Sequence, residues 1–450
     1  MTDHVPAHAP RVPTSFHRFL RLFIDVRPHE VAALGWAWLY FFSVLSSYYV
    51  IRPIRDEMGV AGGVDNLAWL WTGTLVGMTL ANPPFAAMVA RLPRVRFISR
   101  TYRFAILNLL VFLPLVELTS GEANVWVGRV FYIWTSVFNL FVVSIFWATL
   151  VDLFDQDQSQ RLFGFIAAGA TIGSITGSSL TAGLVSVVGT GALLLVSALL
   201  LEVAVRSMQR LTAVSSAANA QQAMRNREVI GGHALAGLTH AVKSPYLLAI
   251  SGYMLLFTIL STFLYFQQAS IAAQAFADRA ARTQFFAQVD LAVNVLTLAL
   301  QFFVTGRLMK ALGVAATLTL LPLLTVFGFL WLGLAPTVAA IVVFQVVRRA
   351  GNFAVARPTR EVLFTLVSRE DKYKAKSFID TFVYRAGDQE GAWSYAGLAA
   401  LGLGVAGIAW VAVPLSVAWV ATGWWAGRRH QRAAAEEAAA GDRAPAPAQA

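Results

Sequence analysis

The sequence lacks cysteine altogether, which excludes disulfides, thiol nucleophiles and cysteine-ligated metals. It also lacks a G-x-x-x-x-G-K-[ST] phosphate loop, an H-E-x-x-H pair, and spacings typical of a catalytic triad or an iron–sulfur cluster. Histidine occurs only in the tails and the central connection, so no histidine relay can form inside an apolar stretch. The seven histidines are His4, His8, His17, His29, His233, His240 and His430. We therefore predict no enzyme activity, catalytic residue, cofactor or metal site.

Charge is scarce as well, because charged residues make up only 13% of the 450. A soluble protein of this size needs about a quarter to cover its surface. Apolar residues, at 57%, fall instead into about twelve stretches near the ~20 residues that a helix needs to cross a bilayer. The sequence thus predicts an all-α, polytopic membrane protein. The expected spans are 31–52, 67–90, 102–118, 125–150, 162–186, 189–205, 246–272, 284–305, 311–333, 336–353, 378–403 and 405–427.

Lysine and arginine are concentrated in every second connection between the spans. With the N-terminus inside, inner segments hold 29 of the 35 basic residues, outer segments hold five, and Arg385 lies within a span. This bias predicts a bacterial inner-membrane protein with both termini in the cytoplasm. The net charge of +11 is therefore attributed to loops beside lipid, and no nucleic-acid partner is expected.

The longest connection divides six spans from six and predicts two halves. We expect a cytoplasmic N-terminal segment (1–30) with an interfacial helix at 14–24, and an N-terminal six-helix bundle (31–205). A cytoplasmic linker (206–245), a C-terminal six-helix bundle (246–427) and a disordered cytoplasmic tail (428–450) would follow. Basic loops after spans two and eight match in position, which suggests the internal repeat of many secondary transporters.

A first group of charges lies at the end of span one. Arg52, Arg55 and Asp56 are three or four residues apart and share a helical face. Two guanidinium groups with one carboxylate leave donors that could receive an anion in a bidentate manner. Pro53 would keep the local backbone irregular. The alternative is an interfacial cluster that only caps the helix.

A second group runs into span eleven. Asp380, Tyr384 and Asp388 follow at four-residue steps and form one polar stripe, while Arg385 is close enough to pair with Asp388. A lone charge in a bilayer costs about 3 kcal/mol or more, so these groups should face partners or a wet cavity. Two glycines, at 387 and 391, would let the helix open locally. A structural salt bridge between helices is the alternative.

Two more stripes lie in the second half. Span seven offers Ser261, Tyr265 and Gln268 on one face, and span eight offers Asp290, Asn294 and Gln301. Such stripes line aqueous pathways or bond neighbouring helices. Asp290 is the acidic residue in the middle of its span and is a candidate proton or coupling site.

Span five carries a doubled G-x-x-x-G at residues 169–177, which predicts close helix packing. Asp152, Asp155 and Asp157 precede it with Arg161. They suit N-terminal capping. They could also pair across the cytoplasmic mouth with the basic 357–376 segment as a gate.

Three strings, at residues 48–56, 146–164 and 373–381, together resemble the ATP/ADP (NTP/NDP) exchange transporter family of the major facilitator superfamily. The resemblance covers all twelve predicted spans. It implies a major facilitator-like arrangement of two six-helix bundles around a central cavity, working by alternating access. The positions that match the family's charged residues are Arg52, Arg55, Asp56, Lys374, Lys376 and Asp380. This chain is shorter than typical translocases, and its loop at 91–96 lacks the superfamily's aspartate.

The sequence therefore predicts a secondary transporter for an organic anion, by resemblance a nucleotide or another phosphorylated or carboxylated metabolite. Exchange and proton-coupled movement both remain open, and a non-transporting membrane sensor or assembly factor with the same fold is the alternative. Expected partners are the small anion and the bilayer; the sequence leaves the oligomeric state open and is compatible with a monomer. Predicted substrate-binding residues are Arg52, Arg55, Arg385, Tyr265, Gln268 and Asn294. Predicted coupling or gating residues are Asp56, Asp290, Asp380, Asp388, Asp152 and Lys376.

Overall fold

The computed structural model describes residues 25–91, 93–218, 244–366, 376 and 378–441, and its regular elements within these ranges are all helical. The predicted interfacial helix at 14–24 lies outside the described residues. So do most of the predicted linker (219–243) and the end of the tail (442–450).

The first half is built from five long helices. They are α2 (Val31–Ala61), α3 (Leu67–Arg91), α4 (Arg94–Leu118), α5 (Gly121–Leu153) and α6 (Gln156–Ala218), with a short 3-10 turn η1 (Val64–Asn66) between α2 and α3. α6 contains two spans in succession, because Gly189 has a φ of 76° and reverses the chain without a separate loop. A left-handed φ is readily adopted only by glycine.

The second half has the same plan, with several interruptions. Its long helices are α8 (Pro245–Ala275), α9 (Arg279–Phe303), α10 (Thr305–Leu334), α11 (Val338–Gly351), α14 (Tyr384–Ala400) and α15 (Val405–Gly441). α11 continues through the π-helical turn η3 (Asn352–Ala356), α12 (Arg357–Val362) and η4 (Leu363–Leu366), and the π-helical turn η5 (Ile379–Val383) leads into α14. Side-chain oxygens of Ser244, Asp278 and Thr337 cap α8, α9 and α11.

Nine helical segments among the described residues are long and apolar enough to cross a membrane, and one of them is the 55-residue part of α6 that holds two spans. α3 and α14 supply the remaining two crossings, and α14 is less apolar because it carries the charges of span eleven. The prediction of an all-α protein with about twelve membrane helices is confirmed.

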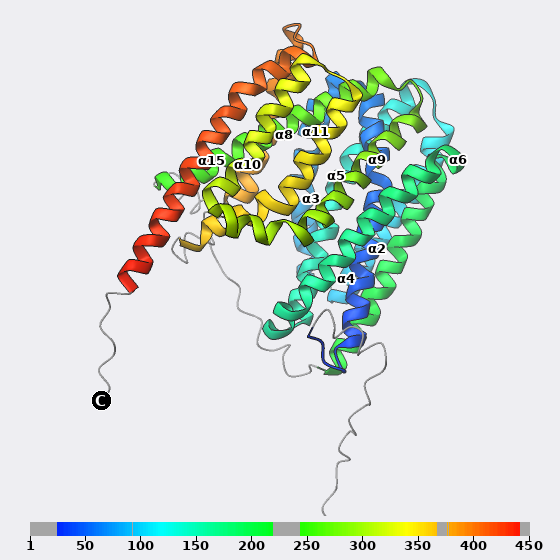
Figure 1. Cartoon of the computed structure of the whole chain (residues 1–450). Coiled ribbons are helices and arrows are strands. Elements are labelled where there is room, and N and C mark those ends of the chain that lie inside the picture. The colour runs from blue at the N-terminus through cyan, green and yellow to red at the C-terminus, as the bar shows by residue number, and fades with distance from the viewer. Residues whose placement is uncertain (1–24, 92, 219–243, 367–375, 377, 442–450) are drawn as a thin grey trace, which may run out of the picture.

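The helices form two bundles that meet on one side of the molecule (Figure 1). We call the side where α2 begins and α15 ends the terminal face, and the other side the opposite face. One apolar core is made of residues 26–211, and the second of residues 247–419. The second core also includes Val60, Leu67, Leu70 and Tyr132 of the first half. The second core thus extends into the first half where α2 ends and α3 begins, at the opposite face.

The doubled G-x-x-x-G of α6 packs against α2, as predicted. A Cβ atom added at Gly173 would collide with the carbonyl oxygen of Phe42, and one at Gly177 with that of Ser46. The Ser46 hydroxyl donates to the Gly173 carbonyl over 3.0 Å. α2 and α6 therefore touch backbone to backbone.

Three helix ends differ from the predictions. α2 runs on to Ala61, and Pro53 lies inside it without ending it, so the expected irregular backbone at Pro53 is wrong. α6 continues to Ala218, into the segment predicted as linker. α15 continues to Gly441, so disorder from 428 onward is wrong for residues up to that point. The alanine-rich sequence after Arg432 has high intrinsic helix propensity, which outweighs its polarity.

Asp155 caps the start of α6, as predicted for this acidic group. Its carboxylate accepts a bond from the Gln158 backbone N–H over 2.8 Å, and the Gln158 side chain accepts one from the Asp155 N–H over 3.1 Å. Asp157 pairs with Arg27 and Arg161 of its own bundle. The predicted gate across the mouth remains a prediction, because residues 367–375 lie outside the described ranges.

A charge cluster at the terminal face gives the first testable expectation. Burial would raise the pKa of Glu30, but hydrogen bonds from Arg161, the Arg27 backbone and Gln158 outweigh it and lower this pKa to about 2. The folded protein therefore gains about 1 kcal/mol from Glu30 above its unfolded pKa, and loses it as pH falls from about 4.5 towards 2. Melting temperatures in detergent between pH 5 and 3 should fall less for Glu30→Gln than for the parent. If the melting temperatures of Glu30→Gln and the parent fall equally between pH 5 and 3, this assignment is wrong.

Candidate functional site

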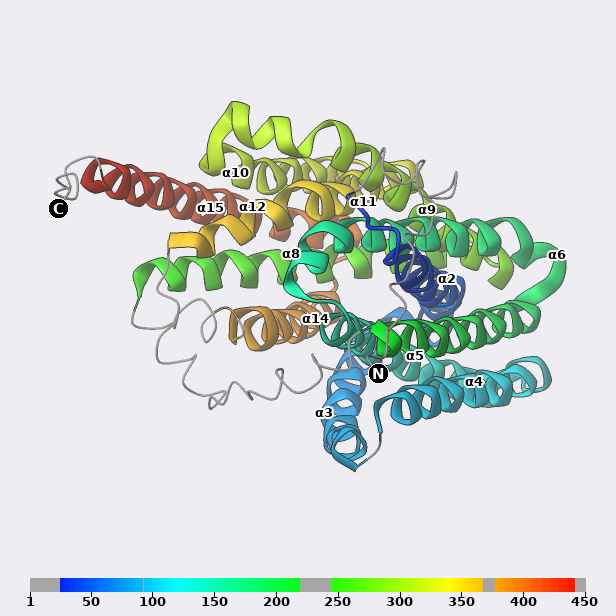
Figure 2. The ribbon, with the colours of Figure 1, turned by 90° about the horizontal axis from the view of Figure 1, so that it is seen from below.

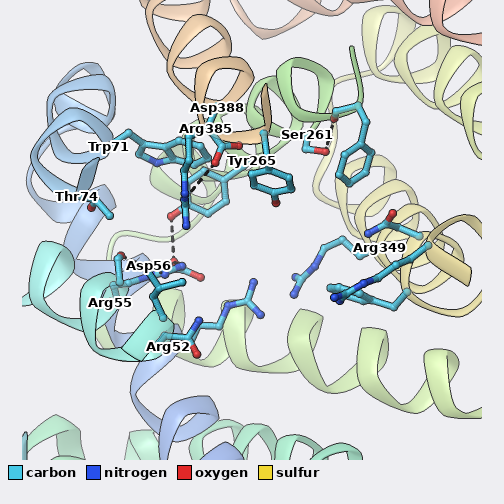
Figure 3. A pocket seen from close by; sticks show the side chains of 18 of the residues that line it. Arg52, Arg55, Asp56, Trp71, Thr74, Ser261, Tyr265, Arg349, Arg385 and Asp388 are labelled. Atoms are coloured by element: carbon cyan, nitrogen blue, oxygen red, sulfur yellow. Dashed lines mark hydrogen bonds and ion pairs between the residues drawn. The ribbon is translucent and has the colours of Figure 1, made fainter. Parts of the chain in front are cut away.

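A cavity of about 810 Å³ lies between the two bundles. Its walls come from α2, α3 and α5 on one side, and from α8, α9, α11, η3, α12, η5 and α14 on the other. Towards the terminal face the lining includes Arg357 and Glu361, which are exposed, so the cavity reaches the surface there. Figure 3 shows the charged part of this cavity.

Nine of the twelve predicted site residues line the cavity. They are Arg52, Arg55, Asp56, Tyr265, Gln268, Asp290, Asp380, Arg385 and Asp388. The other three do not. Asn294 is buried away from the lining, Asp152 is exposed near the end of α5, and Lys376 pairs with Glu361. In span eight the predicted stripe also ends early, because Gln301 is exposed on the surface of α9. In span seven, Ser261, Tyr265 and Gln268 all line the cavity.

The cavity carries more positive than negative charge. Seven arginines and five carboxylate residues line it among the described residues, an excess of two positive charges. Buried or half-buried charges interact strongly because water screens them little. Such a chamber favours an anionic occupant over a cationic one.

Asp290 of α9 joins the two bundles at the centre of the cavity. One carboxylate oxygen, Oδ1, lies 3.4 Å from the Nη1 atom of Arg52 on α2 and 2.8 Å from the Nη2 atom of Arg349 on α11. The Asp290 side chain is only 3% exposed, while the two arginines are 17% and 16% exposed towards the cavity. Its Oδ2 atom has no hydrogen-bond partner among the described residues. One carboxylate therefore contacts two guanidinium groups, and the Nε atom of Arg52 has no hydrogen-bond partner among the described residues.

Asp56 forms a second cross-bundle contact, deeper in the fold. Its Oδ1 atom accepts from Arg55 Nε over 2.9 Å and from the hydroxyl of Tyr265 on α8 over 3.0 Å (Figure 3). The Tyr265 hydroxyl also lies 3.1 Å from that of Tyr132, which accepts from Trp71 Nε1 over 3.0 Å. A chain of polar groups thus runs between α3, α5, α8 and α2 beside the basic residues.

The polar stripe of span eleven lies where η5 joins α14. Arg385 Nη1 is 3.4 Å from Asp388 Oδ2, which confirms the predicted pair, and Arg360 is 4.0 Å from Asp380. The glycines at 387 and 391 do not open the helix. A Cβ atom at Gly387 would collide with Thr258, so these glycines serve close packing of α14 on α8. The local opening occurs one turn earlier, in the π-helical turn η5.

Polar and aromatic contacts close the cavity towards the opposite face. Glu57 at the end of α2 accepts from Arg279 over 3.1 Å and from Arg282 over 3.0 Å, both on α9. Nearby, Thr72 of α3 donates to Gln389 of α14 over 3.0 Å. The rings of Trp69 and Trp393 meet edge to face at 4.7 Å, again between α3 and α14. These contacts tie the first bundle to the second on the side away from the terminal face.

Several cavity arginines were not predicted from the sequence as site residues. Arg348, Arg349, Arg357 and Arg360 were counted with the inner basic segments, yet all four line the cavity. Arg52 and Arg55, which were predicted as site residues at the outer end of span one, lie further inside, within α2. A signal was present for two of them, since Arg348 and Arg349 fall within the predicted span 336–353.

Arg348 is distinctive because it is buried without a carboxylate among the described residues. The residue is 2% exposed. It donates to Thr325 Oγ1 over 3.2 Å, to the Phe257 carbonyl over 3.3 Å and to Ser261 Oγ over 3.0 Å. Its guanidinium also lies 5.4 Å from the Phe257 ring centroid and 5.7 Å from that of Trp419. Neutral oxygens and rings hold this charge, so an anion in the cavity would meet it unneutralised.

Several solved structures have a similar fold, and their titles describe transporters. A bacterial homologue of the iron transporter ferroportin, in an inward-facing state, aligns with a TM-score of 0.60 at 14% identity, covering 89% of this chain and 98% of that one. A POT family transporter aligns with a TM-score of 0.60 at 13% identity, over 89% and 98% of the two chains. A bacterial homologue of the human lysosomal transporter Spinster, inward-facing and unoccupied, gives 0.56 at 13%, over 91% and 99%.

No family model matches the sequence, and no curated protein matches it significantly. At these identities the likeness establishes the fold. The chain has the major facilitator-like arrangement of two helical bundles.

Proposed function

We propose that this protein is a secondary active transporter that moves a small organic anion across the membrane by alternating access. One observation carries the proposal. The cavity between the bundles is closed towards the opposite face, reaches the terminal face, and holds an excess of arginine. A membrane interior admits such charges only where they meet partners or water.

The lining supports a phosphorylated or carboxylated substrate. Guanidinium groups bind both kinds of anion in a bidentate manner. Trp71, Tyr132 and Tyr265 stand beside the basic residues and offer ring faces to a planar group. These features agree with the sequence resemblance to ATP/ADP exchangers, so a nucleotide is one candidate among phosphorylated metabolites.

The charge bias of the loops supports an orientation with the terminal face in the cytoplasm of a bacterial inner membrane. In that orientation the cavity opens inwards. Two of the similar solved structures are titled inward-facing, which agrees with this assignment.

Asp290 supports a coupling role. Its carboxylate forms ion pairs with Arg52 and Arg349, one from each bundle, as the anionic group of a substrate would. An arriving anion competes with Asp290 for these donors and loosens the contact between bundles. In an exchanger the anion itself takes over the pairing, and in a proton-coupled carrier Asp290 binds a proton when released.

Uptake into proteoliposomes of the purified protein tests the proposal and separates the two modes. The first step is a thermal-shift screen against nucleotides, sugar phosphates and dicarboxylates. Exchange requires the counter-substrate inside the vesicles, whereas proton coupling requires a pH gradient. If no anion that stabilises the protein is taken up under either condition, transport is refuted.

Arg348→Gln should raise the KM for the transported anion about ten- to hundredfold, because a hydrogen bond to a charged group contributes about 1.5–3 kcal/mol. The melting temperature should stay the same or rise, since the substitution removes a buried charge that no carboxylate of the described residues balances. Arg432→Gln, exposed on α15 and outside the cavity, is the matched control. A lower melting temperature with an unchanged KM would assign Arg348 to packing alone.

A further inference from the structure

A second pocket lies on the outer surface of the first bundle, between the start of α4 and the end of α6. Its volume is about 570 Å³, and it shares no lining residue with the central cavity. Arg96, Arg100 and Arg103 line it from one face of α4, four and three residues apart. We call this site the basic pocket. Figure 2, which looks onto the terminal face, places α4 at the edge of the molecule.

The positive charge of the basic pocket is only partly neutralised by the described residues. Arg103 pairs with Glu202 of α6 over 3.2 Å. Arg96 and Arg100 are exposed and form no ion pair among the described residues. The site also lies at the first turns of α4, where the helix dipole adds positive potential. Two free guanidinium groups beside a third that is held in place suit a phosphate group.

The same pocket continues into an apolar surface. Phe104 and Leu107, which also line it, are 65% and 57% exposed, and Val111 one turn further is 51% exposed. Side chains of this kind on an outer helix of a membrane bundle face lipid. A soluble anion would use the arginines and leave this apolar strip without a role. An amphipathic molecule with an anionic head would use both.

We propose that the basic pocket binds an anionic phospholipid in the leaflet at the terminal face. Arg96 and Arg100 bind the headgroup phosphate, Arg103 is positioned beside them by Glu202, and the acyl chains lie along Phe104, Leu107 and Val111. The pocket lies across the contact of α4 with α6, since Gln209 of α6 donates to Ser99 of α4 over 3.1 Å within it. The site is independent of the central cavity.

Native mass spectrometry of the purified full-length protein tests this site by titration with phosphatidylglycerol. Each arginine near an anionic lipid strengthens binding roughly fivefold, so Arg96→Gln/Arg100→Gln should weaken it about thirtyfold. Arg429→Gln/Arg432→Gln removes two exposed arginines from α15 at the same face and should change binding less than threefold. Equal losses in both variants would mean general surface attraction and would overturn the proposal.

Two further arms separate a lipid from a soluble anion. Leu107→Asn should weaken phosphatidylglycerol binding and leave the melting temperature of the lipid-free protein unchanged, because Leu107 is exposed. Glycerol phosphate, the headgroup anion without chains, should bind at least a hundredfold more weakly than the lipid. If glycerol phosphate binds as tightly, or if Leu107→Asn has no effect, the acyl chains play no part and the proposal fails.

Discussion

Asp290→Asn is expected to abolish uptake, with a loss of at least about a hundredfold, and to strengthen anion binding at the same time. Asp290 neutralises Arg52 and Arg349 across the bundle interface. Without its charge the two guanidinium groups repel each other and remain open to any anion in the cavity. Breaking a fully buried ion pair costs about 3–5 kcal/mol. We expect about 2 kcal/mol of lost stability here, since both arginines border a wet cavity.

Proteoliposome uptake, ligand-induced thermal shifts and the melting temperature of the ligand-free protein should be compared. The double variant Asp290→Asn/Arg349→Gln should recover the lost stability, because it removes the repulsion, but not the transport. Asp278→Asn is the matched control on the same helix, since asparagine also caps helices well. Uptake within twofold of the parent in Asp290→Asn would rule out a coupling role.

Glu57→Gln is the second change with a large expected effect, and it acts on the opposite face. Glu57 is 2% exposed and binds Arg279 and Arg282 of the other bundle. Glutamine keeps the size of the side chain but loses its charge. The conformer that is closed at the opposite face therefore loses about 2–3 kcal/mol of stabilisation. That energy shifts the ratio of conformers by about thirty- to hundredfold towards a form open at the opposite face. Uptake should fall because the transport cycle requires both conformers, and the conformer closed at the opposite face becomes rare.

Spin labels can measure this shift, and the absence of native cysteine leaves no background labelling. Glu122→Cys on α5 and Ala277→Cys before α9 place exposed labels on the two bundles at the opposite face. Their distance distribution should lengthen in Glu57→Gln. Glu117→Gln is the control, because Glu117 bonds Gly191 within its own bundle. If the distribution stays the same in Glu57→Gln, the contact does not hold this face closed.

The membrane spans were predictable because hydropathy and span length are local properties of the chain. So was the stripe of Asp380, Tyr384 and Asp388, since a four-residue spacing fixes a helical face. The Arg385–Asp388 pair follows from the same spacing. Each of these features depends on residues that are close in the sequence.

The composition of the cavity wall could not be predicted, because it depends on contacts between helices that are distant in the sequence. Loop arginines and cavity arginines look alike in a sequence, so Arg348 and Arg349 were assigned to a surface. The pairing of Asp290 with α2 and α11 joins residues that are far apart along the chain. Asn294 shares a helical face with Asp290 but lies beyond the cavity wall, which only the packing of α9 determines.

The backbone contact between α2 and α6 holds α2 rigidly within the first bundle. Arg52 and Glu57 lie on α2 a little more than one turn apart, and both form ion pairs with α9. Arg52 pairs with Asp290, and Glu57 pairs with Arg279. If the first bundle moves relative to α9 as a rigid body, both ion pairs are therefore strained together. In the transporter that we propose, anion binding at Arg52 and opening of the opposite face would therefore be coupled through α2 itself.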